Sequence, residues 1–67
     1  MSLHPLYPGE YFILKRERPS AGWDLLFRDD SRSTMDCRFS YQKETLKPGQ
    51  AVRYETPAGE LIEETER

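Results

Sequence analysis

The chain has 67 residues, which is enough for one small domain and too few for a substrate domain beside a cofactor domain. Ten Lys and Arg residues stand against twelve Asp and Glu residues, and the net charge of -2 excludes a polybasic, histone-like arm. Charged residues make up 33% of the chain and no apolar run is longer than Tyr11 to Leu14, so the sequence predicts no membrane span.

The chain contains a single cysteine, Cys37, and a single histidine, His4. These two residues cannot form an internal disulfide or a zinc site with three or four ligands. His4 lies next to Pro5, and no pattern places it beside Cys37 as the base of a nucleophilic pair. We therefore expect no metal, no cofactor and a reducing, cytoplasmic setting, with Cys37 acting as a small apolar strand residue.

Proline and glycine clusters divide the chain into short pieces. Residues 1–9 are predicted to be an irregular entry, and turns are predicted at residues 19–22, 29–33, 47–49 and 57–59. The five pieces between them have the length of strands, not of helices. The sequence thus predicts strands at residues 10–18, 23–28, 35–42, 50–55 and 60–63.

The first two pieces differ in their apolar pattern. Residues 11–14 are apolar on both faces and residues 15–18 are charged, which is typical of a strand that is central at its start and projects at its end. In the second piece Trp23, Leu25 and Phe27 fall on one face, as in a half-buried strand.

The third piece has the clearest alternation in the chain. Met35, Cys37, Phe39 and Tyr41 alternate with polar residues, which is the pattern of a strand with one buried face. On this pattern the four side chains lie on one face, which is either half of a small core or, at Phe39 and Tyr41, a surface of rings open to a ligand.

The fourth piece and the C-terminus complete the predicted sheet. Val52 and Tyr54 share one face of the strand at residues 50–55. Residues 60–67 contain good helix formers, but a helix of this length is marginal and its terminal glutamates oppose the helix dipole. We therefore predict a short fifth strand that frays into an acidic tail at residues 64–67, and one domain over residues 10–63.

Five short antiparallel strands predict an all-β fold. Closing them into a small barrel removes the exposed edges that a flat sheet would leave, so we expect a five-stranded antiparallel barrel. An OB-like barrel is the main prediction and an SH3-like barrel is the alternative. Because a core of this size contributes little stability beyond the entropy cost of folding, a homodimer stays an open alternative.

The order of the motifs resembles that of a cold-shock domain. Residues 45–55, with Leu46, Gly49-Gln50 and then alternating Val52 and Tyr54, are similar to the stretch that enters the fourth strand of that family. Residues 21–26 stand in the place of the first RNP motif, with Asp24 and Leu25 where the family has Gly and Phe, and residues 36–41 stand in the place of the second. The resemblance implies an OB-type barrel that binds single-stranded nucleic acid.

The main functional hypothesis is a non-enzymatic module that binds single-stranded RNA or DNA. Bases would stack on aromatic rings and phosphates would meet basic side chains on one sheet face. The predicted contact residues are Trp23, Phe39 and Tyr41 for stacking, and Arg16, Arg28, Arg38 and Lys43 for phosphates. The alternative is a protein-interaction or regulatory module that acts through an edge strand or the acidic tail and binds no nucleic acid.

An enzymatic function rests only on adjacent carboxylates, Asp29-Asp30 and Glu63-Glu64. Such pairs in turns or tails are normally solvent-exposed, whereas acid–base catalysis needs a buried pair with a raised pKa. The glycines are isolated and form no phosphate-binding loop. We therefore expect that the protein is not an enzyme.

Overall fold

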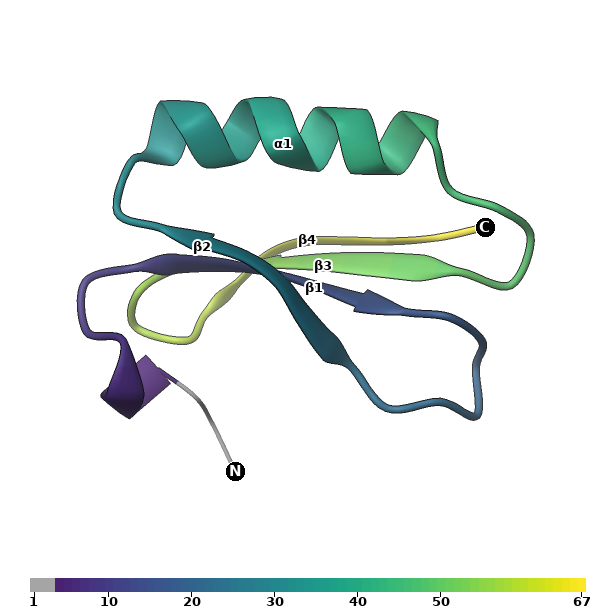
Figure 1. The fold of residues 1–67 in the computed structure, drawn as a ribbon, viewed down its shortest axis with the longest axis horizontal. Coiled ribbons are helices and arrows are strands. Elements are labelled where there is room, and N and C mark those ends of the chain that lie inside the picture. Colours follow the sequence, from purple (N-terminus) through teal and green to yellow (C-terminus); the bar gives the residue numbers. More distant parts are fainter. Residues whose placement is uncertain (1–3) are drawn as a thin grey trace.

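The protein folds into a four-stranded antiparallel sheet with one helix on one of its faces, as the computed structural model shows (Figure 1). The structure describes residues 4–67, without the side chain of His4. Its elements are η1 (His4–Leu6), β1 (Tyr11–Arg16), β2 (Asp24–Asp29), α1 (Arg32–Glu44), β3 (Ala51–Glu55) and β4 (Leu61–Glu66). Two hairpins, β1–β2 and β3–β4, are joined by α1, and the strand order is β2-β1-β3-β4. The β-rich prediction is confirmed, but the closed five-stranded barrel is wrong.

The segment predicted as the third strand is the helix α1. The pair Met35 and Phe39 explains the error, because residues four apart share a face in a strand and also in a helix. Both are buried, whereas Cys37 is exposed and Tyr41 is 63% exposed. Burial therefore follows the helical spacing of four residues and not the strand spacing of two. The cap at Ser31 favours the helix, since its hydroxyl accepts a hydrogen bond from the Thr34 N–H at 3.3 Å.

The core lies between α1 and the sheet. Its buried members are Ile13, Met35, Phe39, Leu46, Val52 and Tyr54, with Tyr11, Phe27 and Ile62 packed around them. The rings of Phe39 and Tyr54 are 5.1 Å apart. The Tyr54 hydroxyl donates a hydrogen bond of 2.8 Å to the carboxylate of Asp36, and burial together with this bond raises the pKa of Tyr54. The helix is thus held by apolar packing and by one polar link to β3.

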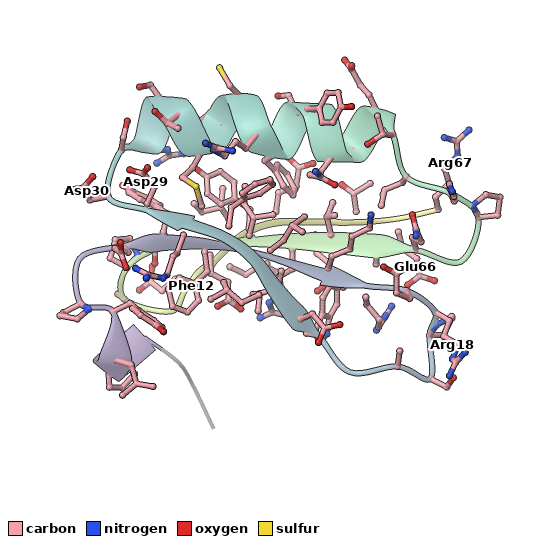
Figure 2. The ribbon with its side chains drawn as sticks, in the orientation of Figure 1. Phe12, Arg18, Asp29, Asp30, Glu66 and Arg67 are labelled. Carbon is pink, nitrogen blue, oxygen red and sulfur yellow. The ribbon has the colours of Figure 1, made fainter. Side chains whose placement is uncertain are left out.

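β1 is the central strand, as its apolar start predicts. It pairs with β2 on one side and with β3 on the other. Phe12 is 1% exposed and Ile13 is 0% exposed, although they point to opposite faces of the sheet. Phe12 lies on the side away from α1 (Figure 2), where the Tyr7 ring meets it edge-on at a centroid distance of 6.0 Å.

The β3–β4 hairpin extends further than predicted. Its turn at residues 57–59 is confirmed, with Gly59 at a φ of +87° that favours glycine. β4 begins at Leu61 and continues to Glu66, so the predicted strand at residues 60–63 is too short and residues 64–66 are not a frayed tail. In the backbone register Glu64 lies opposite Arg53 and Glu66 lies opposite Ala51, so β4 is hydrogen-bonded to β3 along the full length of β3.

The two edges of the sheet are β2 and β4. In the β1–β2 ladder Ile13 pairs with Phe27 and Leu14 pairs with Leu25, so Leu26 is an extra residue that forms a bulge. The bulge separates β2 into a short segment at residues 24–25 and another at residues 27–29. Within residues 4–67 no helix is long and apolar enough to cross a membrane.

The helical assignment predicts unequal effects for two neighbouring substitutions. Met35→Ala removes a fully buried side chain and is expected to lower the free energy of unfolding by about 2–5 kcal/mol. Cys37→Ala changes an exposed side chain and is expected to stay within about 0.5 kcal/mol of the parent. Urea unfolding of both variants measures the difference, and equal large losses would restore the strand prediction.

Candidate functional site

The structure separates the predicted nucleic-acid contacts into three locations. Arg16, Trp23 and Arg28 lie on the sheet face opposite α1, here called the open face. Arg38, Tyr41 and Lys43 are on α1, on the other side of the molecule. Phe39 is only 4% exposed and belongs to the core. The seven residues therefore do not form one surface, because the predicted third strand that joined them is a helix.

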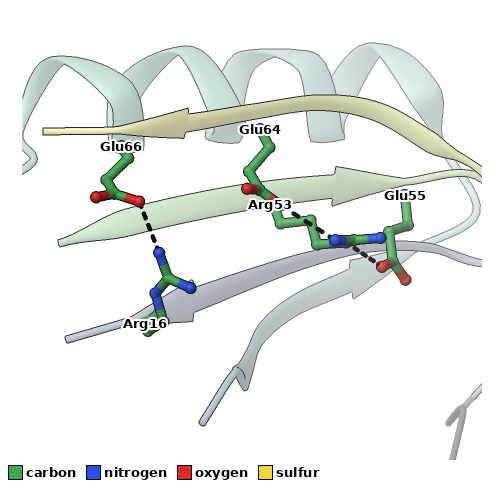
Figure 3. A network of polar contacts seen from close by, with 5 residues as sticks. All are labelled: Arg16, Arg53, Glu55, Glu64 and Glu66. Atoms are coloured by element: carbon green, nitrogen blue, oxygen red, sulfur yellow. Dashed lines mark hydrogen bonds and ion pairs between the residues drawn. The ribbon is translucent and has the colours of Figure 1, made fainter. Parts of the chain in front are cut away.

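The arginines on the open face are paired with glutamates (Figure 3). Arg53 donates hydrogen bonds to Glu55 at 2.6 Å and to Glu64 at 3.1 Å. Arg16 donates to Glu66 at 2.7 Å, and Figure 3 shows this pair next to the first along the sheet. The Arg53–Glu55 pair lies within β3, whereas Arg53–Glu64 joins β3 to β4 and Arg16–Glu66 joins β1 to β4.

Aromatic rings lie beneath two of these guanidinium groups. The Arg16 guanidinium is 4.7 Å from the centroid of Trp23, which is half-buried. The Arg28 guanidinium is 4.0 Å from the centroid of Tyr7 and also pairs with Glu10 at 2.9 Å. The buried Nε of Arg16 has no hydrogen-bond partner among the residues that the structure describes. The open face is thus built from arginines stacked on rings.

The charges of the open face are balanced within the protein. Its three arginines face four carboxylates, those of Glu10, Glu55, Glu64 and Glu66. A phosphate group would have to displace these carboxylates before it could bind the arginines. The arginine stacked on Trp23 is therefore already paired with a carboxylate, as are Arg28 and Arg53.

A second surface lies between α1 and the edge strand β2. It is a groove of about 360 Å³, here called the α1–β2 groove, and it is lined by Phe27, Cys37, Arg38, Tyr41 and Gln42. Phe27 comes from β2 and the other four come from one side of α1. The Arg38 guanidinium lies 4.6 Å from the centroid of Phe27.

The spacing of the groove residues in the sequence indicates a shared surface only if the segment is a helix. Cys37 and Tyr41 are four residues apart, and so are Arg38 and Gln42, which places both pairs on one side of a helix. In a strand the odd and even members would point to opposite faces. Arg38 and Tyr41 were predicted as contact residues for nucleic acid, whereas Phe27, Cys37 and Gln42 were not.

Lys43 is on the other side of α1, facing β4. Its ammonium group lies 3.1 Å from a carboxylate oxygen of Glu63 and 5.2 Å from the centroid of the Phe39 ring. It thus bridges the helix and β4.

Two of the carboxylates considered for catalysis, Asp29 and Glu63, have a lowered pKa, whereas a general acid needs a raised one. The hydrogen bond donated by the Ser31 N–H is the main cause that lowers the pKa of Asp29, and Lys43 is the main cause that lowers the pKa of Glu63. Within residues 4–67, no three His, Cys, Asp or Glu side chains are close enough to hold a metal ion. The carboxylates therefore serve as a helix-start acceptor and an ion-pair partner.

Comparisons with models of protein families, with curated proteins and with solved structures found no match to the chain. The open face and the α1–β2 groove are the two candidate binding surfaces of the described residues. Of the segments that carry the cold-shock resemblance, residues 45–55 enter and form β3, and residues 36–41 lie within α1.

The Lys43–Glu63 pair predicts a pH-dependent effect. The pKa of Glu63 is lowered from 4.5, so its stabilising contribution is present above that value and is lost as the pH falls through the lower pKa of the folded state. Glu63→Gln is expected to cost less than about 1 kcal/mol at neutral pH, because the pair is exposed. Urea unfolding at neutral pH and at about pH 3 should show this cost and then its disappearance.

The matched control is Glu60→Gln, which removes one charge from the turn next to the same strand. It is expected to leave the free energy of unfolding unchanged at both pH values. A pH-independent cost for Glu63→Gln would show that the pair does not supply the effect.

Proposed function

We propose that the protein is an interaction module that binds an extended segment of a partner protein along β2, with one side chain of that segment in the α1–β2 groove. The observation that carries the proposal is the position of an apolar groove beside a sheet edge. Strand addition of this kind takes its affinity from main-chain hydrogen bonds and its specificity from a pocket for a side chain.

The edge supplies the main-chain groups. Among residues 4–67, β2 pairs with β1 alone, so its outer side presents backbone N–H and C=O groups that no other strand uses. The bulge at Leu26 interrupts this row and leaves residues 27–29 as the regular part next to the groove. A short extended segment fits such an edge better than a long strand.

The groove supplies the side-chain pocket. Its lining by Phe27, the Cys37 side chain and Tyr41 is mainly apolar, and a volume of about 360 Å³ accommodates a large aliphatic or aromatic side chain. Tyr41 is 63% exposed and has no packing role in the core, so its ring is free to cover an incoming side chain.

The opposite edge is less suited to a partner strand. β4 contains Glu63, Glu64 and Glu66, and each of these carboxylates accepts a hydrogen bond from a basic side chain of a neighbouring element. An incoming strand would meet a row of acidic side chains there. This asymmetry favours β2 as the site of strand addition.

Selection from a displayed library of random ten-residue peptides tests the proposal. Peptides enriched on the protein should perturb the NMR amide signals of Phe27, Arg38 and Tyr41 and should slow hydrogen exchange in residues 27–29. Tyr41→Ala should weaken these peptides about fivefold or more, as expected when a ring of about 1 kcal/mol or more is removed from an interface. Ser40→Ala, on the outer side of the same helix, should leave binding unchanged.

Two outcomes would overturn the proposal. One is a selection that enriches no peptide, or only peptides that perturb Arg16 and Trp23 on the open face. The other is protection of residues 27–29 without peptide, with a molecular mass that rises with concentration. That result would assign the β2 edge to a second copy of the chain.

Single-stranded nucleic acid binding on the open face is the second candidate. The observation that favours it is the half-buried Trp23 ring beside Arg16, with Arg28 and Arg53 on the same face. Base stacking on Trp23 and contacts from these arginines would be its physical basis. It requires the arginines to exchange their carboxylate partners for phosphates.

A titration with short single-stranded oligonucleotides separates the two candidates. Because the arginines of the open face are paired, we expect the Trp23 fluorescence to stay flat at low salt. Salt-sensitive quenching with a micromolar midpoint, together with weaker binding of a dye-labelled oligonucleotide by Trp23→Phe in fluorescence anisotropy, would instead favour nucleic acid binding on the open face. Circular dichroism of the variant checks that it is folded.

A further inference from the structure

Arg38 differs from the other arginines near a candidate surface. Arg16, Arg28 and Arg53 each have an ion pair with a glutamate, and Arg32 lies 3.7 Å from Asp36. The Arg38 side chain has no ion pair or hydrogen bond to any residue within the described part of the chain, and its guanidinium lies over the ring of Phe27. The α1–β2 groove is therefore lined by an unpaired cation.

We infer that the segment bound in the α1–β2 groove is acidic: it carries a carboxylate that pairs with Arg38, two residues away from the apolar side chain in the groove. This inference rests on the proposed function. The spacing follows from strand geometry, because residues two apart point to the same face and are about 7 Å apart. The partner is thus an extended peptide segment with a carboxylate two residues from its apolar side chain.

The stacking of Arg38 prepares it for such a carboxylate. A guanidinium that lies over a ring keeps its plane fixed and its N–H groups free at the edge, so two of them can donate to one carboxylate. Little side-chain entropy is then lost when the pair forms. A lysine at this position would carry the charge without the flat, two-pronged donor.

Asp29 and Asp30 are carboxylates of the chain itself at the junction between β2 and α1 (Figure 2). Asp29 is close enough for the Arg38 charge to contribute to its lowered pKa, but it accepts its short hydrogen bond from the Ser31 N–H and is not in ion-pair contact with Arg38. It therefore leaves the donors of Arg38 available, and its charge opposes an incoming acid.

The test uses two defined peptides, acetyl-Lys-Thr-Glu-Val-Phe-Thr-Val-Lys-amide and the same peptide with Gln in place of Glu. Dissociation constants from NMR titration should be about two- to fivefold lower for the Glu peptide in about 0.02 M salt, which is the worth of an exposed ion pair. The preference should shrink in about 0.15 M salt, because surface charges are then screened.

Three variants assign the preference to a residue. Arg38→Gln should abolish it, whereas Arg32→Gln, which removes an equal charge from the same helix, should preserve it. Asp29→Asn keeps the oxygen that accepts the Ser31 N–H and removes the opposing charge, so it should tighten the Glu peptide about twofold and leave the Gln peptide unchanged.

The outcomes distinguish the inference from the function on which it rests. Equal binding of both peptides at Phe27 and Tyr41 would overturn the acidic partner and leave strand addition standing. A preference lost equally in Arg32→Gln and Arg38→Gln would also overturn it, since the attraction would then belong to the whole helix. If neither peptide perturbs the groove and the library selection is empty, the proposed function fails as well.

Discussion

The packing of one face of α1 on one face of the sheet is the interaction on which the other features depend. Met35 and Phe39 bury the sheet face that Ile13, Val52 and Tyr54 present. A helix is about 10 Å wide, whereas four strands spaced about 4.8 Å apart span more than that. The helix therefore cannot cover both margins of the sheet with its backbone. Side chains determine whether the space between the helix and each edge strand is closed or open.

The two margins are treated differently. On the β4 side, Lys43 reaches from the helix to Glu63 and closes the gap with a salt bridge. On the β2 side, Arg38 folds over Phe27 instead, and the groove stays open. The face that the helix leaves uncovered is closed by long side chains, because the stems of Arg16 and Arg53 cover apolar surface while their charged ends meet glutamates. The proposed binding site is the β2 margin, where neither a salt bridge nor a long side chain closes the groove.

The sequence predicted those parts of the fold that depend on local chemistry. The central position of β1 follows from apolar residues on both of its faces, and the turn at Gly59 follows from its need for positive φ. The helix at residues 32–44 was not predicted, because Met35 and Phe39 fit the period of a strand as well as that of a helix. The exposure of Cys37 and Tyr41 separates the two periods, and it is known only from the structure. A wrong period at one segment then produced the wrong fold, since a fifth strand suggests a barrel.

The candidate site was less predictable than the fold, for a related reason. Trp23 and Arg16 were recognised as separate residues of interest, but their stacking depends on the register between β1 and β2. The pair of Arg16 and Glu66 joins residues at opposite ends of the chain, and no local pattern indicates it. The α1–β2 groove needs a helix and an edge strand side by side, so it has no signature until both are assigned.

The bulge at Leu26 has a consequence for how copies of this chain behave when they are concentrated. An open sheet with two different edges can in principle grow without limit, each copy adding its β2 to the β4 of the next, as in a fibre. The extra residue offsets the hydrogen-bonding row of β2 halfway along, and in such a stack the glutamates of β4 would face a strand that carries Asp24 and Asp29. The bulge and these carboxylates therefore both oppose growth of the sheet by pairing of β2 with β4.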